Sequence, residues 1–318
     1  MMKVAVLGVW HVHTKYHVKT ALKYGEVVGF YERDDRLAED FQREFGIPRF
    51  QTREELLASE AEGVIICSAT SDHSSDVAAA AKAKKKIFCE KLLALTSEEC
   101  AGIIEAVESN GVELTLEFEQ KYIANRRAVI AAAKSGELGK INFVRFRYCH
   151  SGSSEDQIPA HFYNRAETGG GVIADHGAHG FYMINEVLGM PVSFASVGSV
   201  ACENVSALAK NKDRVEDNAA TLMLFPDGAI AVNECSSVCG NATSAFEVYG
   251  EKGFVCTYND GIKKCSELTG GETVELEAGK GLPLPLVQFM KGEHYPGCSV
   301  YDGAALTKMI EAAYKGMM

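Results

Sequence analysis

The chain has 318 residues, of which 47% are hydrophobic and 24% are charged, and its formal net charge is −11. This is the composition of an ordinary globular protein, and the length is enough for two domains. The acidic balance and the lack of a basic stripe argue against nucleic acid as a partner. No segment approaches the run of about 20 apolar residues that crosses a bilayer, so no membrane partner is expected.

The first 118 residues alternate short apolar segments with helix-like segments. Strands are predicted over residues 4–7, 27–31, 64–67, 87–89 and 112–116. Their apolar runs lack polar alternation, which is typical of strands covered on both faces. Thr52 followed by Glu55, and Thr96 followed by Glu99, fit helix-capping boxes. The alternation predicts an α/β domain over residues 1–120 with a doubly wound parallel sheet.

The pattern changes after residue 120. We expect a helix over 122–134, a strand over 141–148, a helix that ends near Gly189 and a C-terminal helix over 301–314. Between residues 192 and 276, apolar segments are separated by turn signals, which lie at 226–228, 250–253, 259–261 and 270–271. Such punctuation indicates hairpins. Residues 121–318 are therefore predicted to form an α+β domain with an antiparallel sheet.

The ten cysteines are scattered, without a CxxC pair or a disulfide-like framework. Most lie in apolar surroundings, where cysteine behaves as a small buried hydrophobe. The chain also opens directly on an apolar strand, with no signal-peptide architecture. Together these features predict a cytoplasmic protein.

Gly8 follows the first predicted strand and precedes a helix, which is the setting of a dinucleotide-binding turn. The usual fingerprint G-x-G-x-x-G lets the pyrophosphate approach the backbone closely. Here only the first glycine is present, and the loop continues to His13 without another. We expect a reshaped loop in which Trp10 and His11 contact the cofactor.

An acid follows at the end of the second strand. Glu32 lies 24 residues after Gly8 and suits the ribose hydroxyls, which favours NAD. The neighbouring Arg33 can instead hold a 2′-phosphate, so NADP stays open. Glu32 can also be an exposed charge at a strand end.

Small polar residues follow the third strand. Ser68, Ala69 and Thr70 lie where open α/β sheets bind their ligands, and we count them as cofactor contacts. The alternative is that Ser71 or Asp72 only caps the next helix.

His11, His13 and His17 invite a metal interpretation. His13 and His17 are four residues apart and would share a helix face, as zinc-binding pairs do. However, no carboxylate or cysteine lies nearby in the sequence to complete a site, so no metal is predicted.

Three further residues carry the chemistry of proton transfer. Lys91 lies at a strand exit, and Asp175 and His179 follow the glycine tract 169–171. Residues i and i+4 share one face of a helix, so Asp175 and His179 are expected to point into the same space. Each has a plainer alternative: Lys91 as a surface strand end, and His179 as a core histidine bonded to backbone.

These motifs together resemble the Gfo/Idh/MocA family, which includes glucose–fructose oxidoreductase and inositol dehydrogenase. Glu90-Lys91-Leu92 resembles the family's Glu-Lys-Pro, and the glycine tract with Asp175-x-Gly177-x-His179 resembles its glycine tract and Asp-x-Gly-x-His helix. His73 lies 17 residues before Glu90, which is similar to the family's spacing. Further matches are residues 135–140, 225–229 and 249–253.

The resemblance implies a Rossmann domain followed by a domain with a large open, mostly antiparallel sheet. It also implies a nicotinamide cofactor, a sugar-like substrate at the domain cleft, and a homodimer or homotetramer formed through the C-terminal sheet. His73, Glu90 and Lys91 join the expected cofactor contacts. Leu92 departs from the family's proline, and we expect the Lys91–Leu92 peptide bond to be trans.

The reaction implied by the resemblance is oxidation of a secondary alcohol on a sugar or cyclitol, with hydride transfer to NAD or NADP. His179 is the expected base, because imidazole titrates near neutral pH. Lys91 would stabilise charge on the reacting oxygen, and Asp175 would orient the substrate or the lysine. Further substrate contacts are expected from Lys121, Tyr122, His161, Tyr163 and His176. The alternatives are an NAD-dependent glycosidase or lyase with transient redox chemistry, and a non-catalytic dinucleotide-binding sensor.

Overall fold

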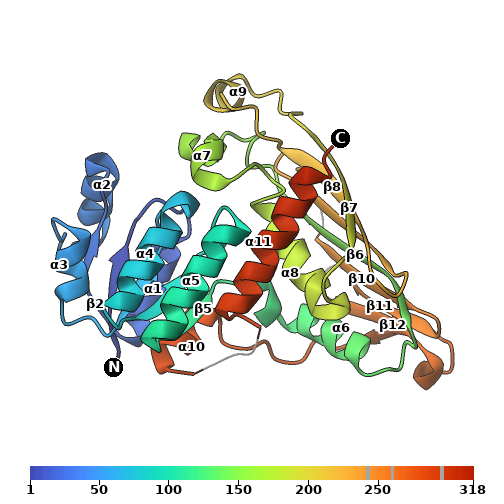
Figure 1. Cartoon of the computed structure of the whole chain (residues 1–318). Helices are drawn as coiled ribbons and strands as arrows, with labels where there is room; N and C mark the ends of the chain where they lie inside the picture. The colour runs from blue at the N-terminus through green and yellow to red at the C-terminus, as the bar shows by residue number, and fades with distance from the viewer. Residues whose placement is uncertain (241–243, 259–260, 294–296) are drawn as a thin grey trace. The chain divides into compact units, whose positions relative to one another are not determined.

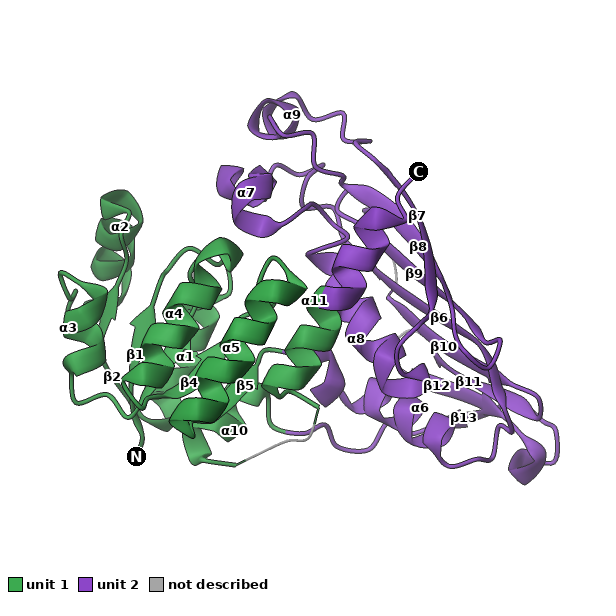
Figure 2. Ribbon diagram, in the orientation of Figure 1, with its two compact units in different colours: residues 1–117, 283–307 green, residues 118–282, 308–318 purple. Residues whose placement is uncertain are grey.

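The computed structural model describes residues 1–240, 244–258, 261–293 and 297–318. Its contacts divide the chain into two compact units (Figure 2). The first contains Met1–Glu117 and Pro283–Thr307, and the second contains Phe118–Leu282 and Lys308–Met318. The chain first leaves the first unit close to the expected boundary at residue 120. The chain re-enters the first unit at Pro283, and neither a turn motif nor a change in composition predicts this second crossing.

The first unit is built on a five-stranded sheet in the order β2-β1-β3-β4-β5, in which each neighbouring pair is parallel (Figure 1). The strands are β1 (Lys3–Leu7), β2 (Glu26–Tyr31), β3 (Gly63–Ile66), β4 (Lys86–Cys89) and β5 (Leu114–Leu116). The helices are α1 (Thr14–Tyr24), α2 (Asp35–Phe45), α3 (Arg53–Ala58), α4 (Thr70–Lys82), α5 (Ser97–Asn110) and α10 (Pro285–Lys291). The predicted doubly wound parallel sheet is confirmed. The strand order reverses between β1 and β3, which is where such sheets bind ligands.

The apolar runs of the strands form the core of this unit. Val4, Val6 and Ile65 are fully buried, as expected when helices cover both faces of a sheet. Leu286 and Phe289 of α10 pack into the same core. The late segment of the chain is therefore an integral part of the first unit.

The two predicted capping boxes differ in outcome. Thr96 and Glu99 exchange both bonds of a capping box at the start of α5. Thr52 accepts the N–H of Glu55 at the start of α3, but the Glu55 carboxylate accepts the N–H of Gln51 instead of that of Thr52. Only half of the second box is present, because the carboxylate reaches one residue further back.

The second unit is built on an eight-stranded sheet in the order β13-β12-β11-β10-β6-β9-β8-β7. The strands are β6 (Ile141–Cys149), β7 (Ser193–Ser199), β8 (Asn218–Leu224), β9 (Ile230–Ser236), β10 (Ala245–Gly250), β11 (Gly253–Tyr258), β12 (Gly261–Cys265) and β13 (Val274–Leu276). All neighbours are antiparallel except β6 and β9, which are parallel. The large, mostly antiparallel sheet is thus confirmed. Of the predicted turns, residues 259–260 lie outside the described residues.

One face of this sheet is covered by α6 (Ala124–Lys134) and α8 (His176–Leu188). The packing is close: a Cβ added to Gly180 of α8 would lie 2.0 Å from Oδ1 of Asn233 on β9. The remaining helical elements are η1 (Glu119–Tyr122), η2 (Ala160–Tyr163), α7 (Arg165–Thr168), α9 (Val205–Lys210), η3 (Glu267–Thr269) and the end of α11 (Val300–Lys315). Along β8 burial alternates strictly, so the sheet has one covered face and one open face.

Across the four described ranges, no helix combines the length and the apolar character needed to cross a membrane.

Candidate functional site

The turn after β1 can only be made by glycine at position 8. Gly8 has a φ of +80°, and a Cβ there would lie 2.4 Å from both Cα and N of Ser68. Its N–H donates to the carbonyl oxygen of Tyr31 at 2.8 Å. The turn is therefore held between the ends of β2 and β3, in a left-handed conformation that L side chains rarely adopt.

A pocket of about 210 Å³ opens at the carboxyl ends of these strands. Six of the predicted cofactor contacts line it: Gly8, Trp10, Glu32, Arg33, Ser68 and Ala69. Five others do not: His11, Thr70, His73, Glu90 and Lys91.

Glu32 is buried in the wall of this pocket rather than exposed at a strand end. Its Oε2 accepts the N–H of Val9 at 2.7 Å, and its Oε1 accepts the N–H of Asp34 at 2.9 Å. A carboxylate oxygen can accept more than one bond, so both oxygens retain capacity for a ligand hydroxyl.

The two arginines that line the pocket, Arg33 and Arg53, form ion pairs with aspartates. Nη1 and Nη2 of Arg33 lie 3.1 and 2.9 Å from the two carboxylate oxygens of Asp72. Arg53 donates to Asp76 at 3.1 Å. Burial raises the pKa of Asp76, although bonds from Ser68 and Arg53 oppose that rise. Arg33 is thus paired with a carboxylate here.

His73 connects the segment after β4 with the segment after β3. Its Nδ1 lies 2.6 Å from the carbonyl oxygen of Leu92, and its Nε2 lies 3.1 Å from that of Ser68. The imidazole is buried and contacts backbone, which points to a positioning role.

The Lys91–Leu92 peptide bond is cis, so the expectation of a trans bond was wrong. Leu92 and Leu93 are buried, and His73 holds the Leu92 carbonyl. These tertiary contacts, rather than the local preference of a non-proline bond, fix the backbone here. Lys91 itself is only 6% exposed, which disagrees with the alternative of a surface strand end.

In the second unit, the glycine tract lets backbone approach a buried glutamate. A Cβ at Gly171 would lie 2.0 Å from the carbonyl oxygen of Glu216. Oε1 of Glu216 accepts the N–H groups of Gly171 and Ile173, each at 3.1 Å, and the hydroxyl of Tyr314 at 2.6 Å. The close approach predicted for the glycine tract is therefore an approach to Glu216, a residue of the same unit. Glu216 and Tyr314 had no local sequence signal, because they lie 45 and 143 residues away from Gly171.

Asp175 precedes the helix that carries His179. Helix α8 begins at His176, and Asp175 is its N-cap residue with φ −90° and ψ −77°. Asp175 thus lies at the N-terminal boundary of α8, and His179 lies within the first turn of that helix. Its Oδ2 lies 3.6 Å from Nε2 of His176.

His179 is buried on α8 among aromatic side chains. Its Nδ1 lies 2.8 Å from the hydroxyl oxygen of Tyr182, which also accepts the N–H of Gln120 at 3.2 Å. The ring centroid of Tyr148 lies 4.8 Å from that of His179. Nδ1 of His179 thus contacts a side chain of the same helix. The sequence reasoning missed Tyr148 and Tyr182, although the i, i+3 spacing of His179 and Tyr182 signals contact on one helix.

The predicted substrate contacts are all in the second unit, and most have structural partners. Lys121 is buried and donates to Glu186 at 3.0 Å. Its neighbour Tyr122 is also buried. The hydroxyl of Tyr163 lies 3.0 Å from Oγ of Ser153.

The other two predicted contacts are histidines. His176 lies next to His150, with ring centroids 4.0 Å apart, and its Nδ1 lies 3.2 Å from the carbonyl oxygen of Ser236. His161 lies on η2 against Phe162. The predicted substrate contact His176 and the predicted base His179 both lie on α8, whereas His161 lies on η2.

Comparison with known proteins agrees with this geometry. Residues 2–118 match the model of an oxidoreductase family with an NAD-binding Rossmann fold. Residues 127–256 match the GFO/IDH/MocA C-terminal domain.

Curated relatives include two inositol enzymes. The myo-inositol 2-dehydrogenase of Thermotoga maritima is 28% identical over 267 residues, which are 81% of this chain and 75% of that protein. The inositol 2-dehydrogenase of Rhizobium meliloti is 26% identical over 205 residues, 64% of this chain and 58% of that protein.

A solved structure of levoglucosan dehydrogenase with NADH and levoglucosan has the same fold. It has a TM-score of 0.81 and 21% identity, and the match covers 99% of this chain and 96% of that one. The two domain matches lie in the expected order, on the two parts of the chain that carry the parallel and the mixed sheet. The chain belongs to the Gfo/Idh/MocA family of NAD-binding oxidoreductases.

Proposed function

We propose that this protein is an NAD-dependent dehydrogenase that interconverts a secondary alcohol and a ketone on a sugar or cyclitol. The observation that carries the cofactor part is the buried Glu32 carboxylate in the pocket at the switch point of the parallel sheet. The names of the curated relatives, which include inositol dehydrogenases and 1,5-anhydro-D-fructose reductase, support the substrate class.

The residues around the pocket fit NAD better than NADP. The Glu32 carboxylate would accept the ribose hydroxyls and repel a 2′-phosphate. Arg33, the cation that would favour the phosphate, is paired with Asp72. A bound nicotinamide would supply the hydride acceptor.

His179 is the proposed base. The hydroxyl oxygen of Tyr182 can accept both the N–H of Gln120 and an N–H from Nδ1 of His179. That tautomer leaves Nε2 as the nitrogen that takes the proton from the substrate hydroxyl. Lys91 stabilises negative charge on the reacting oxygen, and Asp175 orients the substrate.

The open face of the second unit's sheet supports self-association. Its exposed apolar side chains include Val197, Leu222, Leu224 and Ile230 on three neighbouring strands. Contiguous exposed apolar surface is typical of an interaction site. We infer a homodimer or homotetramer through this face. All ten cysteines are free, which suits the reducing cytoplasm as its compartment.

The first test is calorimetric titration of the purified chain, freed of carried-over nucleotide, with NADH and NADPH. Tighter binding of NADH supports the proposal, and binding of neither would overturn it in favour of a sensor. A screen of polyols and cyclitols then follows NADH formation. A substrate that is converted without accumulation of NADH would indicate a glycosidase or lyase with transient redox chemistry.

A further inference from the structure

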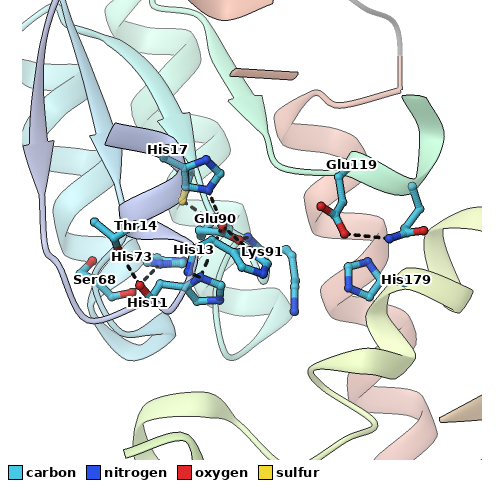
Figure 3. Close-up of polar contacts among 12 residues, drawn as sticks. His11, His13, Thr14, His17, Ser68, His73, Glu90, Lys91, Glu119 and His179 are labelled. Carbon is cyan, nitrogen blue, oxygen red and sulfur yellow. Dashed lines mark hydrogen bonds and ion pairs between the residues drawn. The ribbon is translucent and has the colours of Figure 1, made fainter. Parts of the chain in front are cut away.

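Three histidines surround one buried carboxylate oxygen at the end of β4. Glu90 is fully buried. Its Oε1 lies 2.6 Å from Nε2 of His17, 3.0 Å from Nδ1 of His13 and 3.4 Å from Nδ1 of His11 (Figure 3). The absence of a nearby carboxylate in the sequence was the ground for predicting no metal. In the fold, a residue 77 positions after His13 supplies that carboxylate.

Nδ1 of His11 lies 3.4 Å from Oε1 of Glu90. Nδ1 of His11 accepts the backbone N–H of His13 at 3.2 Å, so in this arrangement it presents a lone pair. A lone-pair nitrogen cannot donate to the carboxylate oxygen 3.4 Å away. An ion bound to this nitrogen would take the place of the His13 N–H, because a ring nitrogen has a single lone pair.

The spacing of these atoms is that of metal ligands. The ligand atoms of His11, His13 and Glu90 all lie within 4.8 Å of one another. Tetrahedral zinc with bonds of 2.0–2.1 Å holds its ligand atoms about 3.3 Å apart. The distances of 3.0 and 3.4 Å from Glu90 to the two histidines are close to this value.

His17 has a different role in this cluster: it holds the carboxylate and is not a metal ligand. At 2.6 Å its Nε2 is at hydrogen-bond distance from Oε1, which is too close for two ligands of one ion. Ligating carboxylates are themselves held by such outer partners, which fix their orientation. His17 is the positioning residue of the cluster.

We propose that His11, His13 and Glu90 form a binding site for one divalent transition-metal ion, best suited to Zn²⁺. Two imidazoles and one carboxylate form a ligand set that zinc accepts, and they leave a fourth position open to water or a ligand oxygen. His13 is 38% exposed at its side chain, which gives the ion a path from solvent. The site does not depend on the proposed substrate or on NAD preference.

The test uses the full chain, dialysed against a chelator and then titrated with Zn²⁺ in competition with a chromogenic indicator. We expect one equivalent to bind. Co²⁺ in its place should give the intense visible absorption of a four-coordinate ion. His11→Gln and His13→Gln should each weaken binding at least about tenfold, since even the loss of an outer partner commonly has that effect.

His150→Gln is the matched control, because it removes an exposed histidine that contacts another histidine in the second unit. It should keep full affinity. His13 is partly exposed, so its variant is expected to fold, and a thermal melt without metal checks this. The proposal fails if the unchanged protein binds less than one equivalent. It fails equally if His13→Gln binds as the unchanged protein does, or if His150→Gln loses as much affinity as His13→Gln.

Discussion

Nδ1 of His179 and the hydroxyl oxygen of Tyr182 lie 2.8 Å apart, one helical turn from each other on α8. The same hydroxyl accepts the N–H of Gln120, so it joins the helix to η1. If His179 is the base, this hydroxyl accepts the N–H of Nδ1 in the tautomer that leaves Nε2 ready for a proton.

Tyr182→Phe should therefore lower kcat about 10- to 100-fold with little change in KM, since the base would lose its orientation but the ring would still stack on Phe118. Steady-state kinetics on the identified polyol measure this effect. Tyr301→Phe, at an exposed tyrosine of the first unit, should leave kcat unchanged. An unaltered kcat in Tyr182→Phe would remove Tyr182 from the mechanism.

Glu32→Gln should weaken NADH binding at least about tenfold and reduce the preference over NADPH. An amide has one acceptor oxygen, so it cannot accept both the Val9 and Asp34 N–H groups as the carboxylate does. Calorimetry with both nucleotides measures the change, and the exposed Glu39→Gln on α2 is the control. Equal NADH affinity in the two variants would contradict the role of Glu32.

Gly8→Ala should cost more stability than Gly46→Ala. Both glycines have positive φ, and the left-handed conformation alone costs about 1–2 kcal/mol for an L residue. Only at Gly8 would the new Cβ also collide with backbone, at 2.4 Å from Ser68. Urea unfolding of both variants compares the losses, and NADH binding should disappear only in Gly8→Ala. Similar unfolding free energies would show that the turn can shift.

Burial raises the pKa of Tyr314 well above its ordinary value, and the neighbouring Glu216 carboxylate adds to the rise. The unfolded chain therefore loses this proton at lower pH than the folded chain does. The stability contributed by the neutral phenol is present below about pH 10 and is lost as the pH rises further. The free energy of unfolding of Tyr314→Phe should fall less steeply above about pH 10 than that of the unchanged protein. Tyr258→Phe, at an exposed position, should follow the unchanged protein; identical slopes for all three would contradict the prediction.

Leu222→Lys should dissociate the proposed oligomer. Leu222 is 52% exposed and lies opposite Ala195 and Val232 on the open face of the sheet. A charge there would be buried by any partner at this face. Light scattering after gel filtration reports the mass. Val205→Lys, at a residue 80% exposed on α9, should keep the mass of the unchanged protein; if Leu222→Lys keeps it too, association uses another surface.

Local pattern was enough to predict much of the fold. The continuous apolar run around Val64 indicates a covered parallel strand, and the turn at Asp227-Gly228 indicates the hairpin of β8 and β9. Both signals lie within a few residues of the feature that they predict. The parallel pairing of β6 with β9 has no such signal, because paired residues such as Phe143 and Ile230 lie far apart in the sequence.

The candidate site shows the same limit. Glu32 and the Gly8 turn could be inferred from a spacing that reflects one βαβ unit. The meeting of Glu90 with His11 and the contact of Gly171 with Glu216 depend on tertiary packing of distant segments. The sequence could not place Asp175 relative to the start of the helix, because a pattern locates a helix end only to within one or two residues.

The core of the first unit is completed by Leu286, Phe289 and Met290, which follow all the strands of the second unit in the chain. While the chain is still on the ribosome, the sheet of residues 1–117 exists without the helix that packs beside α1. Its apolar surface is then exposed to water and to other nascent chains. The first unit therefore cannot complete its core until the segment that follows the second unit's sheet has been synthesised.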